Sequence, residues 1–495
     1  MYYAFVLYYL LLERAASRIP VAGFAQRLAK SVLWQRAYST FLRVPFIIYP
    51  LALLGLSIAF TMLVDRARSF EPADVTSRDL PLQFIYVHDK NWVVAYMHVR
   101  ALAFFVVCSQ SLTLAALYAA TRTRKLKRFD IAVTVVAIAG FFATSFLYRT
   151  LESTDIYSYV ANARLGMIGS YASHIRVSDP GLRGVTELTW GVLPPSPYGP
   201  LCHLYNGWVA NTSSLVQATL RIRAYNASIL VILIVGLVAA RVRPATILLL
   251  GLNPFVYQQF IVNAHNDLTP VAALTLGAVF ARRSMWFPVV AAIAAGLIKL
   301  PLCLVGIVTL VAIRSRAVRV TMTVLIVATV AVLSLAFGGE AYIEALLNVS
   351  NRAVTHDRMQ AALHAFAAVL ALFSIGYAIL TRRRFWPGLV AIPTLSGSMY
   401  PWYLFWLVPT AFAGVDVAAP LLIAFPVVSL FLSDVFGQGG LVRVVSYGLI
   451  GLAAVCYAAM CASSTSGNAR TNRLASRGGI STTRVTAAVK PSSAL

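Results

Sequence analysis

The chain has 495 residues, of which 59% are hydrophobic and only 12% are charged. This composition excludes a water-soluble globular protein, because soluble domains contain roughly 45–50% apolar and about 25% charged residues. The mean hydropathy of +0.76 also excludes a disordered chain, which would be poor in aliphatic side chains. The formal net charge of +24 would suit nucleic-acid binding, so the positions of the basic residues decide what that charge means.

Two terminal regions flank the apolar part of the chain. Residues 1–43 are predicted to be a cytoplasmic segment, in which 1–12 are apolar but too short to cross a bilayer. This start has neither a basic first region nor a small-residue cleavage site, so a signal peptide is not expected. Residues 463–495 are rich in Ser, Thr, Gly and Arg and are predicted to be a disordered cytoplasmic tail.

Residues 44–462 are predicted to form one polytopic transmembrane domain. Apolar runs long enough to cross a hydrocarbon core of about 30 Å lie at 44–64, 98–121, 130–148, 224–241, 245–262, 318–337, 358–381, 417–433 and 441–462. Short or broken helices are predicted at 268–281, 286–298, 301–313, 386–400 and 402–414. The expected fold is an all-α membrane bundle of about 12–14 transmembrane helices.

The basic residues concentrate on one side of this predicted bundle. If the N-terminus is cytoplasmic, the cytoplasmic segments contain 26 of the 41 Lys and Arg residues but only 3 of the 17 Asp and Glu residues. This asymmetry follows the positive-inside rule for membrane proteins. The charge is therefore attributed to membrane orientation, and no nucleic-acid partner is expected.

Residues 149–223 are predicted to be a long extracytoplasmic loop that carries the active site. The loop opens with Asp155, at the start of a short helix that ends near Leu165. It continues with a proline-rich stretch, 194–201, whose fixed φ angles favour a rigid conformation. Residues 201–221 are then predicted to form one interfacial helix rather than a span.

Three further groups of polar or aromatic residues are predicted on the same side of the membrane. The span 245–262 contains Asn253-Pro254, a predicted kink, and leads to an outer rim with His265 and Asp267. The external loop 338–357 ends with a basic and polar group, and an aromatic segment lies at another rim. Their candidate residues are Arg352, His356, Trp402 and Tyr403.

This set of residues suits transfer of a sugar from a lipid phosphate. A fixed carboxylate can remove the proton from an attacking hydroxyl, and Arg or His can hold a phosphate leaving group. The sequence has no Gly-rich phosphate loop for a nucleotide and no metal-ligand spacing. We expect Asp155 to be the catalytic base, with substrate bound by Tyr157, Tyr159, Tyr198, His265, Asn266, Asp267, Arg352, His356, Trp402 and Tyr403.

Each residue also has a simpler structural interpretation. Asp155 can cap the helix that follows it, and Trp402 and Tyr403 can belong to an interfacial aromatic belt. His265, Asp267 and the basic group near Arg352 can be solvated or headgroup-facing residues. Their convergence on one side of the membrane is what favours a site.

At these residues the sequence resembles the GT-C glycosyltransferases, in particular the bacterial polyprenyl-phosphate-mannose-dependent α-(1→6)-mannosyltransferases. The resemblance spans about 150–410 and lies in four motifs: Asp-Ile-Tyr-Ser-Tyr from Asp155 with Gly166, Ser-Pro-Tyr-Gly-Pro-Leu from Ser196, Asn253-Pro254 followed by His265-Asn266-Asp267, and Pro401-Trp402-Tyr403. The resemblance implies inverting transfer of a sugar, with mannose expected, from a polyprenyl phosphate to a hydroxyl of an extracytoplasmic glycan or glycolipid.

The resemblance further implies a multi-pass enzyme of the inner or plasma membrane, with its active site outside the cytoplasm and neither cofactor nor essential metal. Asp155 would be the base, His265 and Asp267 would line the site, and Arg352 or His356 would bind phosphate.

Two other classes of function stay open at this point. A transporter or lipid-linked-sugar flippase would also have broken helices, and Lys299 inside an apolar hairpin is the residue that favours it. That class predicts ionisable groups near the middle of the membrane and two similar halves, whereas the acidic residues here gather at one rim and no internal repeat is found. A membrane scaffold without chemistry predicts that Asp155→Asn has no effect.

Overall fold

The computed structural model describes residues 44–68, 90–123, 125–147, 155–172, 192–354, 358–382, 391–396, 401–412 and 418–432, with a few isolated positions between them. Within these ranges the protein is almost entirely helical. The regular exception is one antiparallel pair of two-residue strands, β1 (Ile175–Arg176) and β2 (Val192–Leu193). The predicted tail and the predicted span 441–462 lie outside the described residues.

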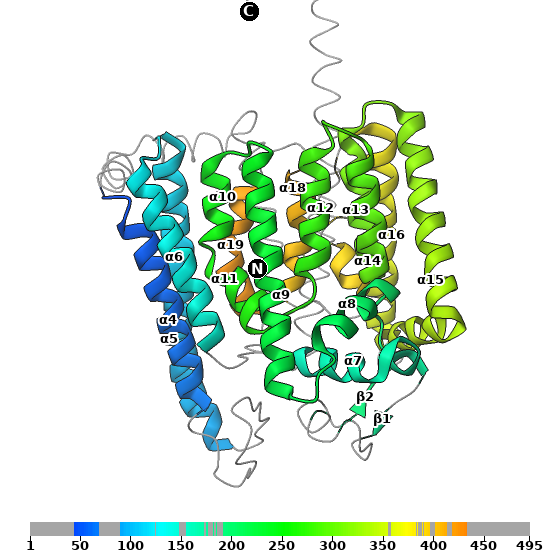
Figure 1. The fold of residues 1–495 in the computed structure, drawn as a ribbon, viewed down its shortest axis with the longest axis horizontal. Helices are drawn as coiled ribbons and strands as arrows, with labels where there is room; N and C mark the ends of the chain where they lie inside the picture. Colours follow the sequence, from blue (N-terminus) through cyan, green and yellow to red (C-terminus); the bar gives the residue numbers. More distant parts are fainter. Residues whose placement is uncertain are drawn as a thin grey trace, which may run out of the picture.

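The first half of the bundle is built from upright helices with one cluster of shorter elements at its end (Figure 1). In chain order these helices are α4 (Ile48–Arg68), α5 (Lys90–Thr123), α6 (Arg128–Leu147), α7 (Asp155–Ala172), α8 (Pro200–Ala210), α9 (Leu215–Ala239), α10 (Pro244–Gly251), α11 (Pro254–Tyr257) and the π-helical turn η3 (Gln258–Val262). In Figure 1, α7, α8 and the strands lie together below the upright helices, whereas the α9–α10 connection is at the opposite end.

The second half adds two helical hairpins and a set of short helices. These are α12 (Leu268–Phe280), α13 (Trp286–Ile298), α14 (Leu300–Thr309), η4 (Leu310–Ala312), α15 (Arg316–Val354), α16 (Arg358–Thr381), η5 (Ile392–Ser396), η6 (Pro401–Leu407), α18 (Val408–Phe412) and α19 (Ala418–Leu432). Helix α13 packs against both α12 and α14, and α12 packs against α9 and α18. The expected short and broken helices are therefore present where the structure describes them.

Three described helices are long and apolar enough to cross a membrane by length and composition: α6, α9 and the part of α15 up to Asn348. A fourth span is formed if α10 and the segment Pro254–Val262, bent by 46°, are counted as one. The other apolar helices of 10–17 residues are shorter than a straight span requires. The all-α membrane class is confirmed, while the count of about 12–14 crossings stays a prediction.

The predicted kink at Asn253-Pro254 is confirmed. Asn253 Oδ1 accepts a hydrogen bond from the Phe255 N–H at 3.1 Å, while its Nδ2 donates to the Leu422 carbonyl at 2.7 Å. Pro254 occupies the first turn of α11, where its missing N–H costs nothing. The asparagine therefore ends one helix, caps the next and fastens the break to α19.

The prediction of one interfacial helix over 201–221 is wrong. The structure ends α8 at Ala210 and starts α9 at Leu215, because Ser214 caps α9 by accepting a hydrogen bond from the Gln217 N–H at 3.3 Å. Residues 215–221 thus belong to the long helix α9. The predicted short helix after Asp155 is also longer than expected, since α7 continues beyond a break at Gly166 (φ 69°) to Ala172.

Helix α15 changes direction at Gly339, where φ is 60° and ψ is −156°. A side chain rarely adopts this φ, so glycine permits the break. The second limb of α15 turns across the end of the bundle that carries α7 (Figure 1), and α15 packs against α7. The break therefore brings the chain up to Val354 to the same end as Asp155.

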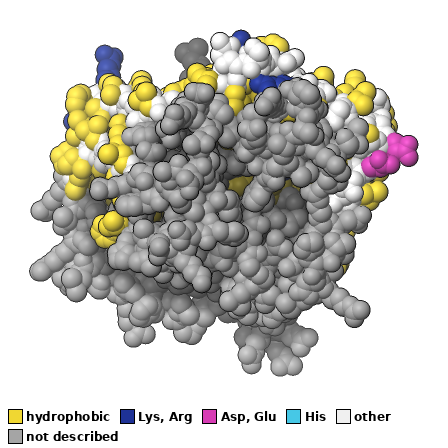
Figure 2. Space-filling model, turned by 90° about the horizontal axis from the view of Figure 1, so that it is seen from below, with side chains coloured by type: hydrophobic (Ala, Val, Ile, Leu, Met, Phe, Trp, Pro, Cys, Tyr) yellow, Lys and Arg dark blue, Asp and Glu magenta, His cyan; other side chains and the backbone are white. Residues whose placement is uncertain are grey.

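Large apolar side chains cover the outer surfaces of the upright helices. Those of Phe105, Leu112, Val136, Val324 and Val369 are all more than 60% exposed. In the view from below, the described side chains around the rim are mostly hydrophobic, with acidic side chains at one edge (Figure 2). An exposed apolar belt of this extent is what a lipid-facing surface requires.

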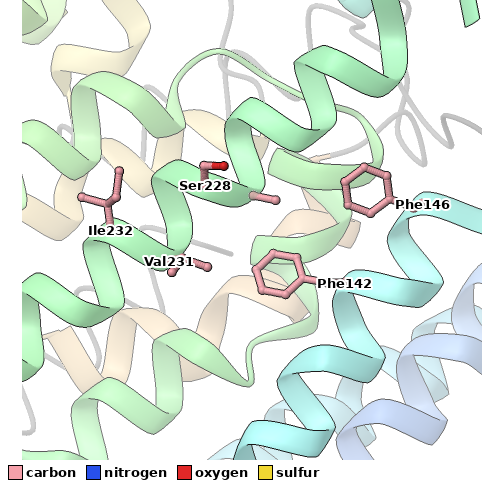
Figure 3. Close-up of a pocket in the computed structure, with 6 residues that line it drawn as sticks. Phe142, Phe146, Ser228, Val231 and Ile232 are labelled. Carbon is pink, nitrogen blue, oxygen red and sulfur yellow. The ribbon is translucent and has the colours of Figure 1, made fainter. Parts of the chain in front are cut away.

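A shallow apolar groove of about 370 Å³ lies on this outer surface between α6 and α9 (Figure 3). Phe142 and Phe146 form one wall, and Ser228, Val231 and Ile232 line the other. The Ser228 hydroxyl already donates to the Ala224 carbonyl at 2.9 Å. The groove contains none of the polar residues predicted for the site.

Candidate active site

Asp155 begins α7 and lies beside an imidazole from a distant part of the chain. Its Oδ2 is 3.2 Å from His265 Nδ1, an ion-pair distance without the alignment of a hydrogen bond. The Asp155 side chain is 34% exposed, whereas that of His265 is fully buried. The sequence predicts that these two groups lie together, and the structure brings them to this distance.

The loop that carries His265 follows a distorted helix end. The π-helical turn Gln258–Val262 widens the chain, and Ala264 then adopts φ 55°, a left-handed conformation uncommon for alanine. Such turns and conformations cost free energy and often occur at functional sites. The helix therefore ends before His265, whose side chain lies beside Asp155 at the start of α7.

Two buried side chains of α9 hold this loop by its carbonyl groups. The Arg223 guanidinium donates to the Val262 carbonyl at 2.8 and 3.1 Å and to the Ser145 carbonyl of α6 at 3.4 Å. Asn226 Nδ2 donates to the carbonyls of Phe260 (2.8 Å) and His265 (3.1 Å). These bonds satisfy carbonyls that the irregular backbone cannot pair itself.

The His265 ring is also fixed by an aromatic contact. It stacks on Trp402 of η6 with ring centroids 3.6 Å apart and an interplanar angle of 19°. Tyr403 packs edge-on against Trp402 at 5.8 Å. The aromatic segment therefore contacts the imidazole, rather than forming only a belt at the membrane surface.

The second carboxylate of the site, Asp267, forms a buried ion pair. Lys299 Nζ lies 2.9 Å from Asp267 Oδ1, and Trp406 Nε1 donates to the same oxygen at 2.7 Å. Asp267 is 1% exposed. Lys299 Nζ also lies over the ring of Tyr403 at 4.3 Å, in cation–π range.

Lys299 occupies the tip of the α13–α14 hairpin, where the proline-rich loop docks. The Gly199 N–H donates to the Ile298 carbonyl at 2.9 Å. A Cβ at Gly199 would lie 2.2 Å from the Leu297 carbonyl oxygen, so only glycine allows this approach. The docking places the Tyr198 ring 5.4 Å from Lys299 Nζ and 5.7 Å from the Tyr159 ring.

Tyr159 and Tyr198 lie close to both carboxylates. Burial raises the pKa of Tyr159 well above its usual value, and the charges of Asp155 and Asp267 raise it further. Burial, followed by the charges of Asp155, Tyr403 and Asp267, does the same for the pKa of Tyr198. Both phenols therefore stay protonated and can donate hydrogen bonds between the two acidic groups.

Asn266 faces α8 rather than the two carboxylates. Its Nδ2 lies 3.4 Å from Cys202 Sγ, a buried thiol that also contacts the Tyr205 hydroxyl at 3.3 Å. Burial raises the pKa of the Cys202 thiol to about 11, so the sulfur is protonated at neutral pH. This cluster fastens the His265 loop to α8.

The position of His265 and Asp267 at an outer membrane rim stays a prediction, but the interpretation of these two residues as solvated is wrong. Both side chains are buried, because α9, the α13–α14 hairpin and η6 enclose their loop. Tyr157 is likewise buried, in a cluster with α9. Arg352 lies on the second limb of α15, where only the backbone is described, and His356 lies outside the described residues.

Lys299 and Trp406 were not predicted as site residues. Lys299 is the single charged residue in 284–313, and this isolation was a signal that the sequence contained. Such a charge inside a membrane protein usually has a partner and a function. Trp406 belongs to the aromatic run already noted, but nothing in the sequence distinguished it from its neighbours.

Among the described residues, no group of three or more His, Cys, Asp or Glu side chains could hold a metal ion. The chemistry that these residues offer is acid–base catalysis by Asp155, positioning by His265, and binding by hydroxyl and aromatic groups. An apolar helical bundle with such polar groups at one end suits a membrane enzyme that acts on a hydroxyl-bearing substrate.

The chain belongs to the alpha-(1→6)-mannopyranosyltransferase family. The sequence model for the N-terminal domain of that family matches residues 61–315, slightly more than half of the chain. The match includes Asp155, the proline-rich loop, His265, Asp267 and Lys299, and it ends before the aromatic segment. No curated protein and no solved structure matches the chain. The resemblance to the GT-C mannosyltransferases is thereby confirmed, and the protein is a glycosyltransferase.

Proposed function

We propose that this enzyme transfers a mannosyl group, with inversion, from a polyprenyl-phosphate donor to a hydroxyl of a glycan or glycolipid acceptor. The family supports mannosyl transfer in general. The lipid-phosphate donor is our inference from the apolar bundle and from the absence of a nucleotide-binding loop in the sequence.

The observation that carries the proposal is the pairing of Asp155 with His265. Asp155 keeps a partly exposed side chain at the start of α7, where an incoming hydroxyl can reach it. His265 Nδ1, on a ring that stacks against Trp402, lies next to Asp155 Oδ2 and orients this carboxylate. A general base oriented by a second group is the arrangement that hydroxyl activation requires.

The reaction is written with Asp155 as the proton acceptor. The acceptor oxygen attacks the anomeric carbon as the bond from that carbon to the phosphate oxygen breaks on the opposite face. The electron pair leaves with the polyprenyl phosphate, and the hydroxyl proton goes to Asp155. Because one displacement occurs, the anomeric configuration is inverted.

The leaving phosphate requires a cation that stabilises developing negative charge. Lys299 is already engaged by Asp267 and surrounded by aromatic rings, so we do not assign it this role. Arg352 is the better candidate, because the break at Gly339 turns its helix toward α7. His356 stays a second candidate on the same segment.

We further propose that the end of the bundle with α7 and α8 faces the extracytoplasmic side. The predicted cytoplasmic segments 241–244 and 282–285 are at the opposite end from α7 (Figure 1). Their basic residues support this orientation through the positive-inside rule.

The test is transfer by purified protein from radiolabelled polyprenyl-phosphate mannose to a mannan-type acceptor. We expect Asp155→Asn to lower kcat by about 10²–10⁴-fold, the usual contribution of a general base, while insertion and thermal unfolding stay unchanged. Transfer by Asp155→Asn at the wild-type rate would contradict the assignment. The control is Asp130→Asn, an acidic residue at the start of α6.

Transport of a lipid-linked sugar is the alternative that the buried Lys299–Asp267 pair favours. The two functions differ in product. A transporter in proteoliposomes moves the labelled lipid without forming a new glycosidic bond, whereas the proposed enzyme forms a labelled glycan with no need for a sealed membrane.

A further inference from the structure

Among the described residues, both hydrogen-bond donors to the Asp267 carboxylate approach the same oxygen, Oδ1. Lys299 Nζ and Trp406 Nε1 both approach Oδ1, at 2.9 and 2.7 Å. Oδ2 is buried and has no hydrogen-bond partner among the described residues. The carboxylate is therefore held in one orientation, with one oxygen neutralised and the other left as an acceptor.

A hydrogen-bond acceptor that is buried without a partner lowers the free energy of unfolding, and this cost is especially large for a carboxylate oxygen. Two atoms of the preceding residues share this condition, since Asn266 Oδ1 and His265 Nε2 are also buried and unpartnered. Within the part of the chain that the structure describes, three consecutive residues thus have buried polar atoms without a hydrogen-bond partner. Asn266 faces α8, so the atoms of His265 and Asp267 are the ones that suit the hydroxyl groups of a ligand near Asp155.

The unpartnered atoms of His265 and Asp267 lie on the loop that approaches Asp155. His265 is next to Asp155, and the phenols of Tyr159 and Tyr198 lie near both carboxylates. A sugar whose anomeric carbon is close to Asp155 would therefore extend toward Asp267.

We infer that Asp267 Oδ2 accepts a hydrogen bond from a hydroxyl of the transferred sugar, and that Lys299 and Trp406 are positioning residues that fix this oxygen. The inference rests on the proposed function. It makes Asp267 a specificity-determining residue, whereas Asp155 carries the proton transfer.

The geometry makes Asp267→Asn an informative variant. Lys299 and Trp406 are both donors, so the amide oxygen must occupy the Oδ1 position and the amide nitrogen the Oδ2 position. The side chain keeps its shape and both existing partners. The group presented to the ligand changes from an acceptor to a donor, and the negative charge that pairs with Lys299 is lost.

The experiment compares polyprenyl-phosphate mannose with its 2-, 3-, 4- and 6-deoxy analogues as donors, using the full-length protein in detergent. Hydrogen bonds to charged groups contribute enough that the wild type should discriminate against one deoxy analogue by about ten- to a hundred-fold in kcat/KM. In Asp267→Asn this discrimination should fall to within about two-fold, and the loss should be confined to that hydroxyl.

The positioning role is tested by variants that leave Asp267 intact. Trp406→Phe keeps an aromatic ring but removes the Nε1 donor, and Lys299→Met removes the cation. Each should reduce discrimination against the same deoxy analogue, and Lys299→Arg should restore part of it. A merely structural role would lower activity with all donors equally. The matched control is Trp208→Phe, because Trp208 is 80% exposed on α8.

The outcomes separate this inference from the proposed function. If the wild type transfers no sugar from polyprenyl-phosphate mannose, the proposed function fails. If the wild type transfers it and Asp267→Asn keeps full discrimination, the inference is overturned and Oδ2 binds a fixed water only. If Lys299→Met does not fold, Trp406→Phe decides the positioning role.

Discussion

The two carboxylates of the site are placed in opposite surroundings. Asp155 is 34% exposed and lies beside one imidazole, whereas Asp267 is 1% exposed and is held by a lysine and an indole N–H. A carboxylate that must take and release a proton needs access and a weak partner. A carboxylate that must orient a ligand needs a fixed position, and a buried charge persists only with a counter-charge.

The largest expected difference between the two is in stability. Asp267→Ala leaves Lys299 buried without its counter-charge, so we expect a loss of roughly 3–5 kcal/mol in the free energy of unfolding. Asp155→Ala should cost less than about 1 kcal/mol, because its side chain is partly solvated. Thermal unfolding in detergent measures both, and equal losses would contradict the comparison.

A second test disturbs the Asp267 side of the site without touching a charge. Gly199→Ala would place a Cβ 2.2 Å from the Leu297 carbonyl oxygen and push the proline-rich loop off the hairpin tip. We expect a loss of about 2–4 kcal/mol together with reduced transfer. Gly207→Ala is the matched control, because a Cβ there meets nothing within 4 Å. Equal behaviour of the two variants would show that the docking is not tight.

A third test concerns the effect of acid on the stability of α8. His203 of α8 is buried against Tyr171, with ring centroids 4.8 Å apart, and burial lowers its pKa to about 4 from 6.5. A lowered histidine pKa means that the unfolded chain binds the proton first, so stability is full above pH 6.5 and falls as pH drops toward 4.

We therefore expect His203 to cost about 2 kcal/mol of stability between pH 7 and pH 5, and His203→Gln to abolish that loss. Unfolding midpoints at the two pH values, measured for wild type and variant, check this. If the variant keeps the full acid sensitivity, the assignment to His203 is contradicted.

The smallest effect is expected on the outer face of α9. Arg223 and Asn226 face inward and hold the His265 loop, whereas Val231 and Ile232 line the apolar groove beside α6 (Figure 3). Val231→Trp should fill part of the groove, change stability by less than about 0.5 kcal/mol and leave transfer within two-fold. A strong loss of transfer would mean that the groove contributes to substrate binding.

Much of the fold followed from local patterns in the sequence. The apolar runs predicted α4, α6, α16 and α19 with small errors at their ends, and Asn253-Pro254 predicted the bend of α10 and α11. Helix α9 was also predicted, but it begins at Leu215 rather than at residue 224. The error at 201–221 came from treating a continuous apolar pattern as one helix, although Ser214 can cap a new one.

The sequence by itself determined the membrane class, the asymmetric charge and the residues Asp155, His265, Asp267 and Trp402 as candidates for one site, because composition, hydrophobic run length and residue type are local properties. Only the tertiary structure decided that Asp267 is paired with Lys299, 32 residues away, and with Trp406, 139 residues away. Such pairings depend on how a hairpin tip and a distant aromatic segment pack around the same loop. No periodicity or spacing in the sequence encodes that packing, which leaves the Asp155 side chain partly exposed and encloses that of Asp267.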